Sequence, residues 1–87
     1  MKIKEGFLLR EVAENYIVVA VGSAVKEFNG IITLNESAAY LWKQLQEDKT
    51  EEQLVDLLLA EYEVSEEQAK LDVNKFVEKL KGANLLD

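Results

Sequence analysis

The pattern of apolar and polar residues in the first third of the chain is typical of β-strands. Two apolar runs, Gly6–Val12 and Tyr16–Val21, flank a short polar segment at residues 13–15. Apolar runs joined by a short polar turn predict an antiparallel hairpin. A third, β-branched run, Ile31–Leu34, follows the turn-forming pair Asn29-Gly30 and predicts a third strand.

After residue 35 the apolar residues follow helical spacing, which predicts three helices. The first spans about Glu36 to Glu47, where Asn35 offers its side-chain oxygen to the first free amides. The second begins after Thr50 and the third after Ser65, because each of these residues opens a four-residue capping-box sequence that ends in Gln.

Helical spacing also predicts which side chains of these helices form the core. The core-facing positions are expected to be Ala38, Leu41, Trp42, Leu45, Leu54, Val55, Leu57, Leu58, Tyr62, Ala69, Val73, Phe76, Val77 and Leu80. Gly82 is expected to end the third helix, and Leu85-Leu86 to fold back onto the core. The predicted fold is a winged-helix-like α+β domain, in which three N-terminal antiparallel strands precede a three-helix bundle, and a chain of 87 residues has room for this single domain over residues 1–87.

The composition excludes most catalytic chemistry. The chain has no Cys and no His, so it lacks thiol nucleophiles, the commonest general base and the usual transition-metal ligands. Acidic pairs at Glu51-Glu52 and Glu66-Glu67 fall in the opening turns of helices, where negative charge complements the helix dipole. We therefore expect no catalytic residues, no metal site and no cofactor.

The net charge of −7, with 17 acidic and 10 basic residues, argues against nucleic acid and anionic membranes as partners. The N-terminus lacks the apolar stretch of a signal peptide, and no apolar run has membrane-spanning length. A Cys-free chain of this kind is expected in the cytoplasm.

Two elements are candidates for binding a peptide. Ile31, Ile32, Thr33 and Leu34 contain no charge and no proline, the usual protections of an edge strand, so this strand is either covered by another element or open to an incoming strand. On the third helix, Lys70, Asn74, Val77 and Lys81 form a stripe beside the core positions. That stripe is either a solvated helix edge or the wall of a groove for an apolar, partly acidic peptide.

The segment Phe28-Asn29-Gly30-Ile31-Ile32-Thr33-Leu34-Asn35-Glu36-Ser37-Ala38-Ala39-Tyr40-Leu41-Trp42 resembles the signature of the PqqD-like family, named for pyrroloquinoline quinone synthesis protein D. The resemblance extends over nearly the whole chain. Supporting matches are Gly6–Val12, Thr50–Leu54, Leu58, Glu61-Tyr62, Asp72-Val73, Phe76, Leu80 and Leu85-Leu86.

The resemblance implies a non-catalytic recognition element that binds the leader segment of a ribosomally made precursor peptide. It also implies presentation of that peptide to a modifying enzyme, often of the radical S-adenosylmethionine type. The leader would add as a strand to the third β-strand and lie beside the third helix. The matching positions here are Ile31, Ile32, Thr33 and Leu34 on the strand and Lys70, Asn74, Val77 and Lys81 on the helix.

Two alternative functions stay open at this stage. A winged-helix DNA-binding protein would need a basic recognition helix, whereas the third helix carries Glu66, Glu67, Asp72 and Glu78 among its lysines. An oligomerising structural module would pair its open strand with a second copy and form a homodimer.

Overall fold

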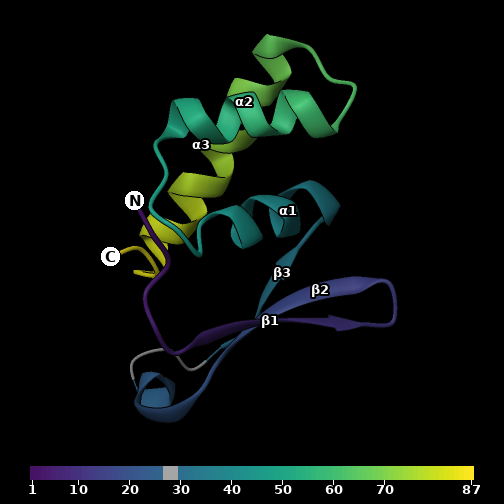
Figure 1. Cartoon of the computed structure of the whole chain (residues 1–87). Coiled ribbons are helices and arrows are strands. Elements are labelled where there is room, and N and C mark those ends of the chain that lie inside the picture. The colour runs from purple at the N-terminus through teal and green to yellow at the C-terminus, as the bar shows by residue number, and fades with distance from the viewer. Residues whose placement is uncertain (27–29) are drawn as a thin grey trace.

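A three-stranded antiparallel sheet forms one layer of the structure, and three helices lie on one side of it (Figure 1). The structure is a computed structural model that describes residues 1–26 and 30–87. Its elements are β1 (Phe7–Val12), β2 (Asn15–Ala20), the short 3-10 helix η1 (Gly22–Lys26), β3 (Ile32–Leu34), α1 (Glu36–Gln44), α2 (Glu51–Glu61) and α3 (Glu66–Gly82). The predicted α+β order of three strands followed by three helices is therefore confirmed.

The predicted hairpin is confirmed as the β1–β2 pair, in which Phe7 lies opposite Ala20 and Val12 opposite Asn15. The tight turn between them places Ala13 at φ 57°, in the left-handed region. β3 then pairs with β2, and Ile17 lies opposite Thr33. The predicted turn at Asn29-Gly30 lies partly outside the described residues, because these exclude Asn29.

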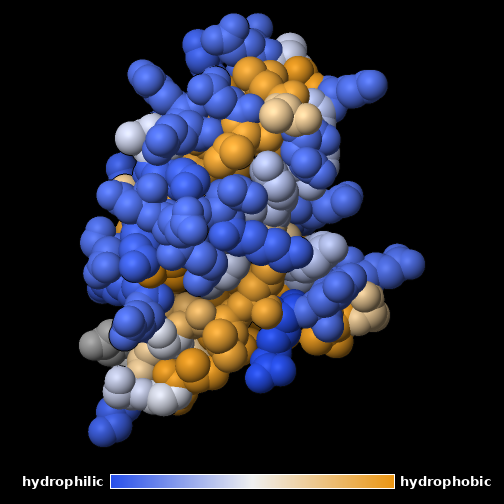
Figure 2. All heavy atoms as spheres, viewed as in Figure 1, coloured by the Kyte–Doolittle hydropathy of each residue, from blue (hydrophilic) through white to orange (hydrophobic). Residues whose placement is uncertain are grey.

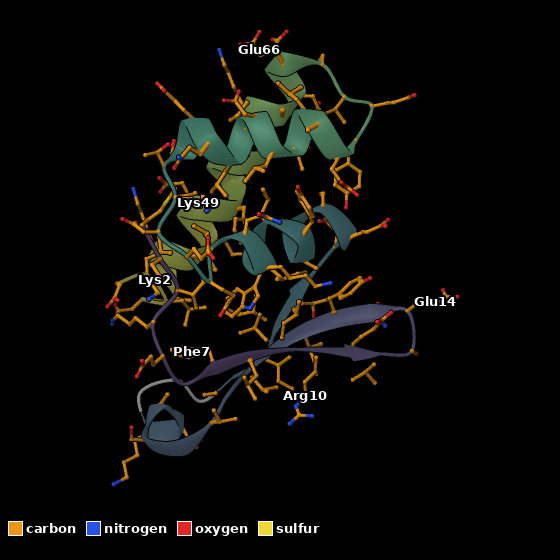
Figure 3. All side chains as sticks on the ribbon, viewed as in Figure 1. Lys2, Phe7, Arg10, Glu14, Lys49 and Glu66 are labelled. Atoms are coloured by element: carbon orange, nitrogen blue, oxygen red, sulfur yellow. The ribbon has the colours of Figure 1, made fainter. Side chains whose placement is uncertain are left out.

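The core lies between the inner face of the sheet and the helices. Val18 and Leu34 contribute from the sheet, and both side chains are buried against apolar residues of all three helices. Trp42, expected in the core, is 2% exposed. The outer face of the sheet carries exposed Leu8 and Val12, and Arg10 points away from the helices (Figure 3). Figure 2 shows the resulting contrast, with apolar residues gathered over the sheet and polar residues over the helices.

The two ends of the chain lie side by side and close the bundle (Figure 1). Ile3 forms a β-bridge with Leu86, and the amide of Lys4 donates to the carbonyl of Leu85 at 2.9 Å. Leu85 is fully buried, which confirms that the last residues fold back onto the core. The reversal after α3 uses Asn84 at φ 58°, which follows the helix end predicted at Gly82.

The helix caps agree with the sequence in two cases and differ in the third. Asn35 accepts a hydrogen bond from the amide of Ala38 at 2.8 Å, and Thr50 forms a complete capping box with Gln53. The capping box predicted at Ser65 is only half formed. Ser65 accepts from the amide of Gln68, but the Gln68 side chain donates to Asp72 at 2.8 Å. The Gln68 side chain therefore donates to a carboxylate one turn along instead of accepting a hydrogen bond from the backbone N–H of Ser65.

α1 ends at Gln44, before the predicted end at Glu47. The amide of Glu47 donates to the carbonyl of Gln44, only three residues earlier, so residues after Leu45 continue as tight turns. In residues 1–26 and 30–87, no helix combines the length and the hydropathy needed to cross a bilayer.

Candidate functional site

β3 is an edge strand, and no second strand among the described residues pairs with its outer side. The sheet order is β1-β2-β3, so within the described part of the chain β2 is the strand to which β3 pairs. β1, the opposite edge, carries the charged residues Arg10 and Glu11, whereas β3 carries none. Charged side chains protect edges against further strand pairing, so the β3 edge is the less protected one.

The outward-facing backbone of β3 can be assigned from one contact. The Lys79 ammonium on α3 donates to the carbonyl oxygen of Thr33 at 3.1 Å, so this carbonyl points away from β2. The N–H and C=O of a strand residue in an antiparallel ladder point the same way, and successive residues alternate. Thr33 therefore presents its backbone groups to the open edge, while the backbone groups of Ile32 and Leu34 face β2.

A groove of about 160 Å³ lies between this edge, the start of α1 and one side of α3. Its apolar lining is Leu34, Ala38, Leu41 and Phe76, and its polar lining is Asn35, Ser37, Asp72, Lys75 and Lys79. An apolar base beneath a polar rim is the usual character of a site that takes an apolar side chain on an otherwise hydrated segment.

α3 presents this lining because Asp72, Lys75, Phe76 and Lys79 recur at spacings of three and four residues, which places them on one side of a helix. One turn before these residues, the side-chain amide of Gln68 donates a hydrogen bond to the Asp72 carboxylate. The groove thus has an acidic end at Asp72 and a basic end at Lys75 and Lys79. Asp72 also lines a neighbouring hollow with Asn35 and Ser37, beyond the C-terminal end of β3. The basic end lies toward the N-terminal end of β3.

The four strand residues of the predicted site are placed together at this edge. Leu34 is 3% exposed and lines the groove, while Thr33 turns its backbone outward. Ile31 precedes β3 and is 66% exposed, and Ile32 is half-buried. A peptide-binding role for these residues stays a prediction, but their geometry fits it.

The four predicted helix residues do not face β3. Lys70 and Asn74 line a separate hollow between α2 and α3, and Val77 is fully buried. Lys81 lies 4.0 Å from Glu78 on the exposed surface. The stripe that the sequence favoured thus lies away from the groove beside β3, because α2 packs near it and Val77 belongs to the core, and the peptide-binding role of its four residues stays a prediction.

Sequence reasoning missed Asp72, Lys75 and Lys79 as lining residues. The helical periodicity places polar stripes on both sides of the buried stripe, and each contains two lysines. Periodicity alone therefore does not say which stripe adjoins the sheet. The two polar stripes are distinguished by the burial of both Val73 and Val77, because this burial extends the core toward α2.

Two tyrosines behind the groove have structural roles. Tyr40 and Tyr62 pack edge to face, with their ring centroids 5.7 Å apart, and the Tyr40 hydroxyl donates to the carbonyl of Leu57. Burial, followed by the charges of Glu36 and Glu61, raises the pKa of Tyr62. The predicted packing role of Tyr62 is confirmed. Among residues 1–26 and 30–87, no cluster of acidic side chains is arranged to hold a metal ion.

Comparison with solved structures shows the same fold in two proteins. The structure of TbiB1 in complex with the TbiA(beta) leader peptide matches with a TM-score of 0.76 and 23% sequence identity, covering 100% of this chain and 95% of that one. The lasso peptide synthetase B1 complexed with the leader peptide matches with a TM-score of 0.72 and 19% identity, covering 97% and 93%.

No curated protein sequence matches the chain. A family profile does match, over residues 8–86, and it includes every element described above from β1 onward. The profile is that of coenzyme PQQ synthesis protein D, and the chain belongs to this PqqD family.

Proposed function

We propose that this chain is a non-catalytic peptide-binding module that captures the leader segment of a ribosomally made precursor peptide in the cytoplasm. The leader adds as a fourth strand to the open edge of β3 and is thereby held for a modifying enzyme. The observation that carries the proposal is the outward-facing backbone of Thr33 directly beside an apolar groove. Membership of the PqqD family, and leader peptides in the complexes of TbiB1 and the lasso peptide synthetase B1, support it.

Backbone pairing at β3 supplies binding that tolerates many sequences. The outward residue Thr33 offers one N–H and one C=O, and each hydrogen bond contributes about 0.5–1.5 kcal/mol net. Such bonds fix the path of the leader without specifying its side chains.

The groove supplies selectivity and a comparable share of the affinity. Side chains on a bound strand alternate, so every second leader residue turns toward Leu34, Ala38 and Phe76. Burying an apolar side chain there contributes about 1.5–3 kcal/mol. A leader with one apolar residue in the correct register therefore binds well above the background of backbone pairing alone.

The partner that acts on the captured peptide is proposed to be a radical S-adenosylmethionine enzyme, as the PqqD-like resemblance implies. The protein itself leaves the peptide unchanged in this scheme. Its contribution is to raise the concentration of the precursor at the enzyme, an effect of tethering rather than of chemistry.

An unbiased display library of short linear peptides, selected on the purified protein, provides a probe without knowledge of the natural precursor. In amide NMR spectra, titration with an enriched peptide is expected to shift residues 30–35 and the groove-facing positions 72–79, and to leave β1 unchanged. Enriched peptides that shift only residues outside the β3 edge, or a library from which nothing is enriched, would refute the proposal.

A matched pair of variants sharpens this test. Ala38→Phe places a ring in the groove, whereas Ala60→Phe makes the same change on the exposed side of α2. We expect A38F to abolish binding of the selected peptide and A60F to retain it. Light scattering with and without peptide addresses the homodimer, because a dimer that saturating peptide dissociates uses the β3 edge, whereas a dimer that persists forms through another surface.

A further inference from the structure

The Lys79 side chain occupies the backbone acceptor that an incoming strand needs. Its ammonium reaches from α3 to the carbonyl of Thr33 at 3.1 Å, a contact between residues 46 apart in sequence. Lys79 also lines the groove, with Lys75 one turn before it. The free protein thus covers the centre of its open edge with a flexible, exposed cation rather than with a rigid element.

Strand addition changes the surroundings of this cation. An amide of the bound peptide takes the outward position at Thr33, so the ammonium moves off the carbonyl while the peptide shields it from solvent on one side. A partly desolvated cation without a partner is unfavourable, and a carboxylate on the peptide is the group that compensates it best.

We infer that Lys79 is a specificity-determining residue that selects leaders carrying a carboxylate at one defined strand position. This inference rests on the proposed function and names the chemistry of the leader. Cross-strand neighbours share a face of the sheet, so the peptide residues opposite Ile32 and Leu34 turn toward the helices. The apolar anchor lies opposite Leu34, beside Ala38 and Phe76, and the carboxylate lies opposite Ile32, toward the basic end of the groove.

The carboxylate and the apolar anchor are therefore separated by one intervening residue. The acidic end of the groove strengthens this register. Asp72 lies beyond the C-terminal end of β3. It therefore repels a peptide that places its acidic side chain at this end of the groove instead of opposite Ile32. The leader thus carries an Asp or Glu two positions from an apolar residue, with no acid on the far side of that residue.

The test repeats the peptide selection on the wild type, on Lys79→Met and on Lys43→Met. K43M removes one exposed cation from α1, outside the residues that line the groove, so it changes the net charge equally without altering the groove. Peptides enriched on the wild type and on K43M are expected to share the acidic residue at the stated spacing. Peptides enriched on K79M are expected to lack it, and Lys79→Arg is expected to restore it.

Affinity measurements then quantify the preference. An enriched peptide and its Asp→Asn or Glu→Gln counterpart are expected to differ by about three- to tenfold on the wild type, on K43M and on K79R, and not to differ on K79M. An acid preference that survives K79M overturns the inference, as do peptides that shift residues 30–35 but show no acid dependence. In both cases the proposed function stands. Peptides that bind away from residues 30–35 overturn the proposed function itself.

Discussion

Replacing single residues of β3 by proline separates the open side of the strand from the paired side. Proline has no N–H, so its effect depends on where the missing donor pointed. At Thr33 the donor faces the open edge, while at Ile32 it faces β2. We therefore expect Thr33→Pro to weaken peptide binding with little loss of stability, and Ile32→Pro to destabilise the fold.

The expected magnitudes follow from these placements. T33P removes one hydrogen bond to the peptide, about 0.5–1.5 kcal/mol, and its ring also obstructs the incoming strand, so affinity falls at least about fivefold. The proline φ of about −65° lies within the broad β region, so the fold loses less than about 1 kcal/mol. I32P leaves a β2 carbonyl without its donor and removes a half-buried side chain, which together cost about 2–4 kcal/mol.

Trp42 provides the stability assay, since the only tryptophan of the chain is buried at 2% exposure and reports unfolding by fluorescence. Urea unfolding gives the free energy of unfolding of each variant, and titration of the selected peptide gives its affinity. Thr33→Val is the control, because it keeps the backbone N–H at the same position and should alter neither quantity substantially.

Two results would refute the assignment of the strand sides. Destabilisation by T33P equal to that by I32P would mean that the Thr33 amide bonds within the sheet. Unchanged peptide affinity in a stable, folded T33P would mean that the peptide does not pair with β3 at this residue.

Three further predictions concern stability. Leu80→Ala should lower the free energy of unfolding by about 2–5 kcal/mol, because Leu80 is fully buried. Leu71→Ala on the same helix should lower it by less than about 1 kcal/mol, because the Leu71 side chain is 47% exposed. Urea unfolding of the two variants compares these losses. The N-terminal ammonium donates a hydrogen bond to the Asp48 carboxylate at 2.6 Å and lowers the pKa of this carboxyl below its ordinary value of 3.8. The ion pair therefore stabilises the fold above pH 3.8, and this stabilisation is lost as the pH falls through the lowered pKa. The difference in urea midpoint between wild type and Asp48→Asn should vanish below the lowered pKa. The pKa of Tyr62 is raised, so the neutral phenol contributes its full share to the stability of the fold up to about pH 10.0, the ordinary pKa of tyrosine. This contribution is lost as the pH rises through the raised pKa of the folded protein. Ultraviolet titration should show one phenolate that forms at higher pH than the others and that Tyr62→Phe removes.

The order of elements could be predicted from the sequence because each boundary has a local cause. Asn35, Thr50 and Ser65 begin the helices, since their side chains bond to amides within the next turn. The hairpin likewise depends on a short polar turn between apolar runs. Such signals involve residues near one another in sequence, so they predict the element boundaries without knowledge of the tertiary structure.

The lining of the groove could not be predicted in this way, because it depends on how α3 rotates against the sheet and α2. That rotation is set by packing among all elements of the core, including Val77, which helical spacing placed both in the core and on the supposed groove wall. The sequence therefore predicted the strand that lies beside the groove but not the residues of α3 that line it. Lys79 acquires its role only when α3 is placed beside Thr33.

Lys79 also bears on how an uncharged edge strand avoids pairing with a second copy of the chain. Most edges are protected by charges or proline within the strand itself, and these would also exclude a peptide. Here the charge belongs to α3 and reaches the edge through a flexible side chain, so it can withdraw. Two copies paired through β3 about a two-fold axis would bring their Lys79 ammoniums to the same junction, with no carboxylate on either strand to compensate them. In the proposed complex, a peptide that supplies a carboxylate would meet no such repulsion, so the same residue would disfavour a homodimer and favour the acidic leader.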